Sequence, residues 1–238
     1  MKASLVLEEL KGYGKKSRVS DIARFYKTGP GEYAEGDVFL GGTVPQTRSV
    51  ANSYKNLDLV EIQKLFNSPF HEARLCAAII LNLKFKAAES SQDRKKIFNF
   101  YLKQVRAEKI NNWDIVDVSA PWMGVYLTEV EDPMPLLIKF SKSKSLWQRR
   151  VSIILTFALI RAGDLAPTIK IAETLLKDRE DLIHKAVGWM LRELGKKDVH
   201  LLRNFLANHS HEMPRTMLRY SIEKLPERER KNWLTESK

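Results

Sequence analysis

Trp113 and Asp117 are the two side chains of this sequence whose types and spacing best fit a chemical role. Residues four apart lie side by side on one face of a helix, and Asn112 is a good N-cap for such a helix. An indole face attracts cations, and a carboxylate beside it can stabilise a developing positive charge or position a water molecule. The same spacing also allows a structural interpretation, in which an acid stabilises the helix dipole and Trp113 fills the core.

A second tryptophan strengthens the chemical interpretation. Trp189 occupies the position of a later helical repeat that corresponds to Asp117, and Arg150 lies on the helix between them in sequence order. We therefore expect Trp113, Asp117, Arg150 and Trp189 to gather around one point. Two aromatic rings, an acid and an arginine at one place indicate a site rather than packing alone.

No metal or other cofactor is expected. The five histidines lack the spacing of a metal-binding motif, and the single cysteine, Cys76, excludes a Cys-x-x-Cys pair. Cys76 lies in an apolar run, where it reads as a small buried hydrophobe. The lack of a disulfide framework is typical of a reducing compartment, so we expect a cytoplasmic protein.

The charge balance predicts an acidic partner. Lysine and arginine number 40 against 29 aspartates and glutamates, which gives a net charge of +11. A surplus of this size favours a nucleic acid, an anionic membrane or a polyphosphate. No apolar stretch approaches the ~18 residues that cross a bilayer, and the N-terminal residues do not resemble a secretory signal. Nucleic acid is therefore the expected partner, and a membrane is not.

The elements that would position these residues are helices. Residues 1–56 contain short helices over 4–13, 18–27 and 45–55, with a Gly-rich connection from Thr28 to Thr43. Residues 57–238 read as about five pairs of amphipathic helices with a period of roughly 30–40 residues, which is typical of HEAT-like repeats. We predict an all-α fold, an α-solenoid of HEAT-like helical repeats that forms a single domain over 1–238.

The second helix of each pair should line the concave face of such a solenoid. Basic residues recur near the beginning of these helices, and a continuous basic groove would bind phosphates. A generic solvated basic surface is the alternative. The predicted DNA-binding residues are Arg74, Arg149, Arg150, Lys185, Arg192, Arg215 and Arg219.

Five motifs, in order along nearly the whole chain, resemble those of the AlkD-like DNA alkylation repair enzymes. Asn111-Asn-Trp-Asp-Ile-Val-Asp117 looks like the N-x-W-D-x-V-D motif of that family. The other four segments, which run from Phe25 to Gly41, from Trp147 to Arg150, from Lys185 to Glu193 and from Met213 to Tyr220, are similar to its further motifs.

The resemblance implies a monofunctional DNA glycosylase with HEAT-like repeats that hydrolyses the N-glycosidic bond of N3- and N7-alkylated purines in duplex DNA. It implies that Asp117 is the catalytic carboxylate, that Trp113 and Trp189 pack against the deoxyribose, and that Arg150 holds the backbone. Asp181 and Leu182 stand where that family's type members carry two aromatic residues.

Tyr26 or Tyr33 could supply further aromatic surface near the lesion.

Two alternative functions compete with the glycosylase. The first rival function is a non-catalytic HEAT-like binder of damaged or branched DNA, and the second is a scaffold for an acidic protein. Retention of both Trp113 and Asp117 favours the enzyme, which we expect to act as a monomer.

Overall fold

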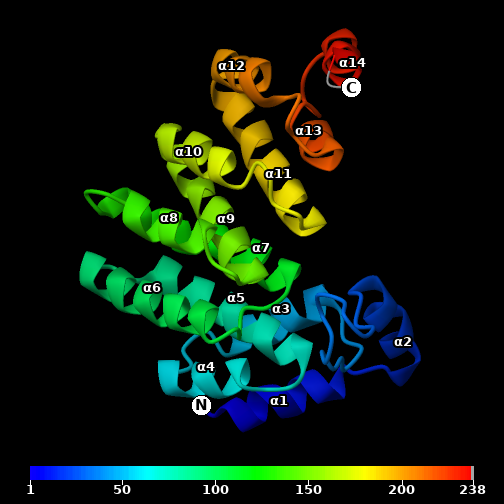
Figure 1. Ribbon diagram of the computed structural model, residues 1–238. Coiled ribbons are helices and arrows are strands. Elements are labelled where there is room, and N and C mark those ends of the chain that lie inside the picture. The colour runs from blue at the N-terminus through cyan, green and yellow to red at the C-terminus, as the bar shows by residue number, and fades with distance from the viewer. Residues whose placement is uncertain (237–238) are drawn as a thin grey trace. The chain divides into compact units, whose positions relative to one another are not determined.

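The fold is all-α, as predicted. The computed structural model describes residues 1–236, and over this part of the chain it forms helices and one isolated bridge between Val38 and Phe70 (Figure 1). The helices of the first half are α1 (Ala3–Gly12), α2 (Lys16–Phe25), α3 (Val44–Ser53), α4 (Leu59–Phe66), α5 (His71–Ala87), α6 (Ser91–Arg106) and α7 (Trp113–Met123). The second half contains the 3-10 helix η1 (Gly124–Glu129), α8 (Met134–Ser141), α9 (Leu146–Ala162), α10 (Ala166–Thr174), α11 (Asp181–Lys197), α12 (Val199–His209), α13 (Arg215–Ser221) and α14 (Glu227–Glu236).

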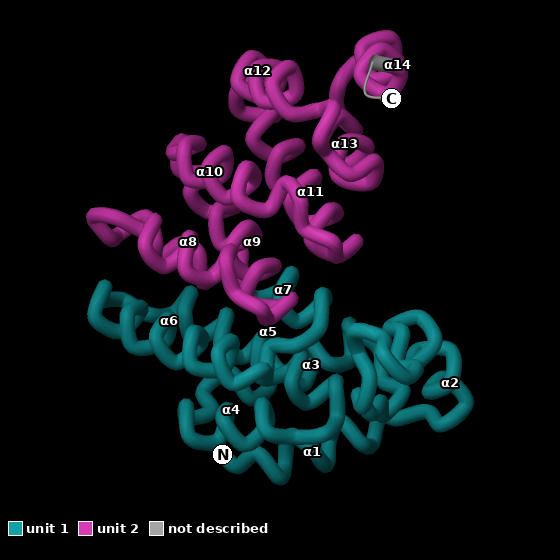
Figure 2. The backbone as a smooth tube through the Cα atoms, viewed as in Figure 1, with its two compact units in different colours: residues 1–119 teal, residues 120–238 magenta. Residues whose placement is uncertain are grey.

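The chain divides into two compact units, residues 1–119 and residues 120–238 (Figure 2). The boundary falls inside α7, which gives its first seven residues to unit 1. The expectation of one domain over 1–238 stays a prediction. Among the described residues, no helix is both long enough and apolar enough to span a bilayer.

Unit 1 is organised around α5. This helix is apolar on nearly all sides and packs against α3, α4 and α6, so that even its first residues are buried. A helix that is hydrophobic all round must be enclosed by other elements. Its N-terminal residue, His71, is therefore held inside the protein.

The Gly-rich connection after α2 is tied to α5 by hydrogen bonds. The backbone N–H groups of Leu40 and Gly41 donate to the Glu72 carboxylate, at 2.9 Å from each nitrogen to its nearer oxygen. Gly41 has a φ of 88°, and a Cβ there would lie 2.2 Å from the carbonyl oxygen of Lys15. Only glycine fits that position. Thr43 then begins α3 with a capping box to Gln46.

Unit 2 is organised around α9 and α11. Helix α9 packs against η1, α8, α10 and α11, and α11 also packs against α12 and α13. Gly188 allows α11 to approach α13 closely, because a Cβ at this residue would lie 2.5 Å from the Cβ of Tyr220. The pairs α8/α9, α10/α11 and α12/α13 follow one another along the chain, and α14 comes after the last expected pair.

Candidate functional site

Trp113 and Asp117 lie one turn apart at the beginning of α7, and both side chains are half-buried. The carboxylate of Asp117 lies close enough to Tyr101 to affect its titration. Burial, and to a lesser extent the Asp117 charge, raises the pKa of the Tyr101 hydroxyl. The sequence prediction that the indole and the acid share one helical turn is met by this geometry.

The indole of Trp113 rests on a buried ring. Tyr26, at the C-terminal end of α2, stacks against it with ring centroids 5.4 Å apart and an interplanar angle of 14°. Phe25 approaches the indole edge-on, with centroids 5.9 Å apart. Tyr26 is only 9% exposed, whereas Phe25 is 66% exposed. Trp113 is thus covered by a tyrosine within the protein and flanked by a phenylalanine open to solvent.

Tyr26 is anchored by a polar network beneath the stack. Its hydroxyl donates to Oδ2 of Asp114 over 2.9 Å, and the same oxygen lies 2.8 Å from Nε2 of His71. The other ring nitrogen of His71, Nδ1, lies 3.2 Å from Oδ2 of Asp37. Asp37 comes from the Gly-rich connection, so three separate segments meet at the imidazole.

The Asp37 carboxylate interacts with three side chains. Besides His71, it accepts a hydrogen bond from Nδ2 of Asn112 over 3.0 Å and pairs with a guanidinium nitrogen of Arg74 at 2.5 Å. Asn112 also accepts a hydrogen bond from the backbone N–H of Trp113 through its side-chain oxygen, over 2.8 Å. The network is therefore connected to Trp113 in two ways. Asn112 accepts a hydrogen bond from its backbone N–H, and Tyr26 stacks on its ring.

The charges of this network fix its protonation. Burial alone would lower the pKa of His71, but the Asp114 charge and hydrogen bonds to Asp114 and Asp37 outweigh it and raise the pKa to about 9. Burial would raise the pKa of Asp37, yet the hydrogen bond from His71 and the Arg74 charge hold it below its usual value. At neutral pH the imidazole of His71 is therefore protonated where it contacts Asp37 and Asp114.

Arg74 has a different position from the one expected of a groove residue. It is 5% exposed, and besides Asp37 its guanidinium binds the carbonyl oxygens of Ser68 and Pro69, in the turn before α5. Arg149 repeats this arrangement in unit 2, where it binds the carbonyls of Ser143 and Lys144. Its carboxylate partner there is Asp178, at 2.6 Å.

These two arginines explain why basic residues recur at one point of successive repeats. Arg74 and Arg149 are both the fourth residue of their helix, and His184, the fourth residue of α11, likewise binds the carbonyl oxygen of Asp178. A donor at this position satisfies the carbonyls of the preceding turn. The recurrence therefore has a structural cause in these repeats, which the sequence alone did not reveal.

In unit 2, Arg150 and Trp189 lie on α9 and α11. Arg150 is 4% exposed and donates to the carbonyl oxygen of Leu182. Trp189 is half-buried, and its ring centroid lies 6.0 Å from that of Phe157. Gly188, directly before Trp189, is the residue that permits the close contact of α11 with α13.

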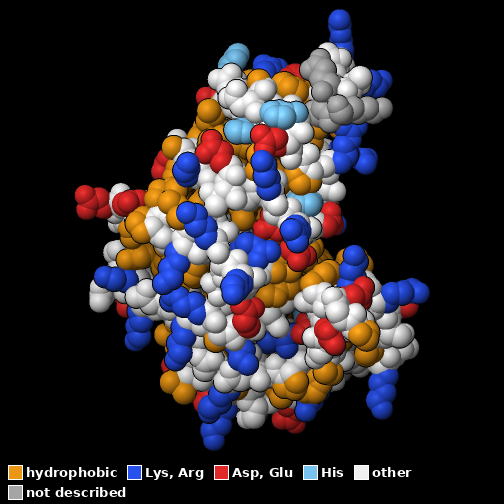
Figure 3. Space-filling model, in the orientation of Figure 1, with side chains coloured by type: hydrophobic (Ala, Val, Ile, Leu, Met, Phe, Trp, Pro, Cys, Tyr) orange, Lys and Arg blue, Asp and Glu red, His pale blue; other side chains and the backbone are white. Residues whose placement is uncertain are grey.

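Of the other predicted cations of unit 2, two form ion pairs with acidic side chains and two are exposed. Lys185 forms an ion pair with Asp181 at 2.6 Å, and Arg192 pairs with Glu223. Arg215 and Arg219 are exposed, one turn apart on α13. Lysine and arginine side chains are numerous on the visible face of the protein, but acidic side chains lie among them (Figure 3).

The two tyrosines proposed as lesion-side aromatics have other surroundings. Tyr26 is buried beneath Trp113, and Tyr33 packs against the small cluster of Tyr26, Ala34 and Phe39. Phe25 is the exposed aromatic ring next to Trp113, and its position was not predicted from the sequence. Sequence analysis also did not identify His71, Asp37 and Asp114 as site residues. A histidine that begins an otherwise apolar helix is a signal that could have indicated His71.

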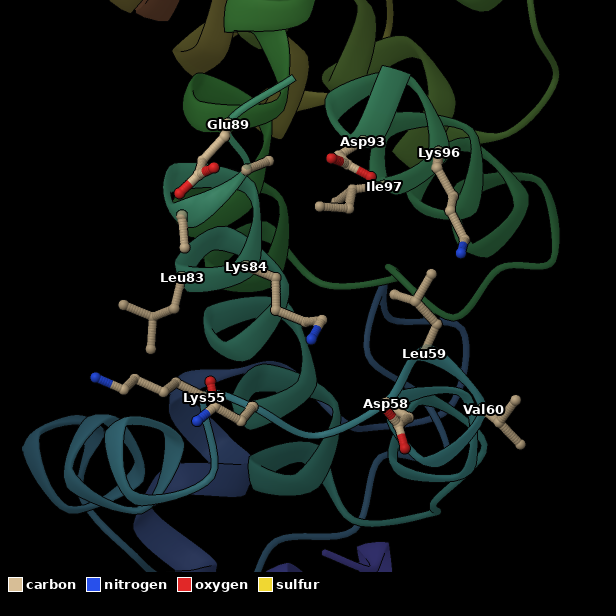
Figure 4. Close-up of a pocket in the computed structure, with 13 residues that line it drawn as sticks. Lys55, Asp58, Leu59, Val60, Leu83, Lys84, Glu89, Asp93, Lys96 and Ile97 are labelled. Atoms are coloured by element: carbon tan, nitrogen blue, oxygen red, sulfur yellow. The ribbon is translucent and has the colours of Figure 1, made fainter. Parts of the chain in front are cut away.

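A cavity of unit 1 lies away from these residues. It has a volume of about 840 Å³ and is formed by the α3–α4 connection, the end of α5 and the beginning of α6 (Figure 4). Leu59, Leu83 and Ile97 supply apolar surface, and lysines alternate with acids around them. It contains none of the predicted site residues, so we attribute the chemistry to the α7 region instead.

Comparison with known proteins identifies the family. The sequence profile of the family described as DNA alkylation repair enzyme matches residues 6–225. The chain therefore belongs to the DNA alkylation repair enzyme family. No curated protein matches it significantly.

Two solved structures share the fold. The chain is similar to a predicted DNA alkylation repair enzyme from Enterococcus faecalis, with 16% identity, a TM-score of 0.70, and coverage of 90% of this chain and 97% of that one. It is also similar to a member of a new family of proteins related to the HEAT-like repeat DNA glycosylases, with affinity for branched DNA structures. That match has 15% identity, a TM-score of 0.56, and coverage of 89% and 83%. The predicted HEAT-like repeat fold is thereby confirmed.

Proposed function

We propose that the protein is a monofunctional DNA glycosylase that removes N3- and N7-alkylated purines from duplex DNA. The observation that carries this proposal is the pairing of Trp113 with Asp117 on the first turns of α7, within a chain of the DNA alkylation repair family. A net charge of +11 supports a polyanionic substrate.

The chemistry follows from the charge of the damaged base. An N-alkylated purine is already cationic, so when its bond to C1′ breaks, the electron pair passes to the base nitrogen and the base leaves neutral. The positive charge then appears on the sugar as an oxocarbenium-like centre. Asp117 and the face of Trp113 stabilise that centre more strongly than the intact nucleotide, which lowers the barrier.

Water completes the reaction. Its oxygen forms the new bond to C1′, and its proton passes to Asp117 or to solvent. No strong general acid is needed, because the leaving base requires no proton. Asp117 must be ionised for both roles.

Unit 2 contributes further contacts to the same DNA in this proposal. Trp189 packs against the deoxyribose. Arg150, which is as buried as Arg74 and donates to the carbonyl oxygen of Leu182, holds the phosphate backbone beside the lesion once that contact opens on DNA binding. Lys185, Arg192, Arg215 and Arg219 bind phosphates farther along. Arg215 and Arg219 are the best placed of the four because both are exposed.

The direct test is incubation of the protein with methylated duplex DNA, followed by chromatography of the released bases. We expect release of 3-methyladenine or 7-methylguanine. Asp117→Asn keeps the shape of the side chain and removes its charge, so excision should fall by at least ~10²-fold while DNA affinity stays nearly unchanged. Excision by Asp117→Asn at the original rate would contradict the assignment of Asp117.

A second candidate function is favoured by one comparison. The similar structure with affinity for branched DNA suggests a non-catalytic binder of branched or damaged DNA. The two functions are separated by measuring affinity for a linear duplex, a methylated duplex and a four-way junction alongside base release. Preference for the junction with no released base would favour the binder.

A further inference from the structure

The Trp113 indole is restrained by two rings in different directions. Tyr26 lies parallel to one face, and Phe25 meets the indole edge-on at an interplanar angle of 73°. A tryptophan side chain has two rotatable bonds, and a ring on its face together with a ring at its edge limits both. Of these two rings, only Tyr26 is itself held from within the protein.

Tyr26 is fixed by contacts on each of its sides. Its hydroxyl is bonded to Asp114, and its ring lies 4.8 Å from the His71 ring and 5.1 Å from the Phe39 ring, measured between centroids. Asp114 is the sequence neighbour of Trp113, and its second oxygen, Oδ1, accepts the backbone N–H of Ile115 over 2.8 Å. The tyrosine is thus bonded to the same helical turn whose indole it supports.

His71 makes this arrangement rigid. It contacts Asp114 through Nε2 and Asp37 through Nδ1, and its ring is 2% exposed. Both nitrogens of the imidazole are therefore occupied, and rotation of the ring would break two hydrogen bonds inside the protein. Hydrogen bonds at both imidazole nitrogens, beneath an aromatic stack, restrict the geometry of the stack.

We propose that Tyr26, held by Asp114 and His71, is a positioning residue that sets the orientation of the Trp113 indole toward the deoxyribose. This inference rests on the proposed glycosylase function. Tyr26 does not contact the substrate, because it lies beneath the indole, and it acts only through Trp113. A purely structural role for the cluster, in which it merely fastens α2 and the Gly-rich connection to α5, is the competing explanation.

A double-mutant cycle separates the two explanations. The single-turnover excision rate is measured for the wild-type protein, Tyr26→Leu, Trp113→Ala and the double variant, below the unfolding temperature of each. A 1 Å misplacement of a positioned group can cost ~10²-fold, so we expect Tyr26→Leu to slow excision about tenfold. In the Trp113→Ala background the same change should have less than about a twofold effect. Equal losses in both backgrounds would overturn the proposal.

A spectroscopic measurement provides a second arm that needs no excision. The near-ultraviolet circular dichroism of Trp113 is obtained as the difference between the wild-type protein and Trp113→Phe. We expect this band to weaken when Tyr26 is replaced, because the indole loses its fixed environment. An unchanged band in the Tyr26→Leu background would overturn the positioning role. If the wild-type protein releases no base, the proposed function fails and this arm alone decides the role of Tyr26.

Two further variants keep the result interpretable. Phe66→Leu removes a fully buried ring from α4, so it reports the effect of lost packing alone, and it should leave the excision rate unchanged. Tyr26→Phe retains the ring and deletes only the bond to Asp114. If Tyr26→Leu does not fold, Tyr26→Phe is carried through the same cycle, with a smaller loss expected that again vanishes without Trp113.

Discussion

Trp113 of unit 1 and Trp189 of unit 2 are both half-buried indoles, but they are held by different means. Trp113 rests on a tyrosine whose hydroxyl belongs to a network of buried charges. Trp189 is held by helix packing, with Phe157 beside it and Gly188 allowing α13 to come close. A half-buried aromatic ring can therefore be oriented either by polar bonds beneath it or by the packing of the surrounding helices.

Removal of each indole should expose this difference most strongly. We expect Trp113→Ala and Trp189→Ala each to slow excision by about ten- to a hundredfold, since each variant loses one of the two rings proposed to pack against the sugar. Trp113→Ala should also cost about 2 kcal/mol of unfolding free energy, roughly half the cost of a fully buried tryptophan, because it uncovers Tyr26. Single-turnover kinetics and urea denaturation measure the two effects.

Trp189 of unit 2 is tested by the same two measurements. Trp189→Ala should lower the unfolding free energy by no more than about 2 kcal/mol, as expected for a half-buried ring, and the protein should stay folded. If instead this variant unfolds, Trp189 is a core residue and its proposed contact with the sugar is wrong. Phe157→Leu serves as the control for packing around Trp189.

The all-α repeat fold could be predicted because local patterns in the sequence determine where the helices lie. Apolar residues at helical spacing located the helices, and Asn112 marked where one of them begins. The pairing of Trp113 with Asp117 was accessible for the same reason, since a four-residue spacing fixes which side chains are neighbours. The final helix, α14, was missed because its sequence is highly charged and carries little apolar pattern.

The network under Trp113 could not be predicted in this way. Asp37, His71 and Asp114 are separated by more than thirty residues from one another, and each taken alone has an ordinary explanation as a loop or helix-end residue. Arg74 is the converse case. Its recurrence predicted a place in a binding groove, whereas in the structure it is buried and its guanidinium binds the carbonyl oxygens of Ser68 and Pro69 before α5.

Because the polar anchor is found in unit 1, pH should affect the two regions differently. The pKa of His71 is about 9 in the folded protein and about 6.5 when unfolded. A raised pKa means that the protonated imidazole stabilises the fold fully below pH ~6.5, and that this stabilisation is lost as the pH rises through ~9. The expected contribution is about 3 kcal/mol.

The measurement is urea denaturation of the wild-type protein and His71→Gln between pH ~6 and pH ~9.5. The difference between the two proteins should shrink as the pH rises. His184→Gln, which alters the histidine at the equivalent helix position of unit 2, is the matched control. A difference that stays constant with pH would show that His71 is not charged in the folded protein.

The smallest expected effect concerns the cations of the two regions. Arg215 and Arg219 of unit 2 are exposed, whereas Arg74 of unit 1 is buried against Asp37. If the exposed pair binds phosphates, Arg215→Gln combined with Arg219→Gln should weaken DNA binding only several-fold near physiological salt. It should also reduce the slope of log affinity against log salt by about 0.9 for each phosphate that the variant protein leaves unneutralised.

Arg74→Gln should behave in the opposite way. It breaks a buried ion pair and leaves Asp37 without its guanidinium, so the unfolding free energy should fall by about 3 kcal/mol while the salt slope is unchanged. Lys170→Gln, an exposed lysine on α10 paired with Glu173, controls for the loss of a surface charge. A salt slope that responds to Arg74 but not to Arg215 and Arg219 would reverse the assignment, because counterion release follows only the cations that replace salt at the phosphates.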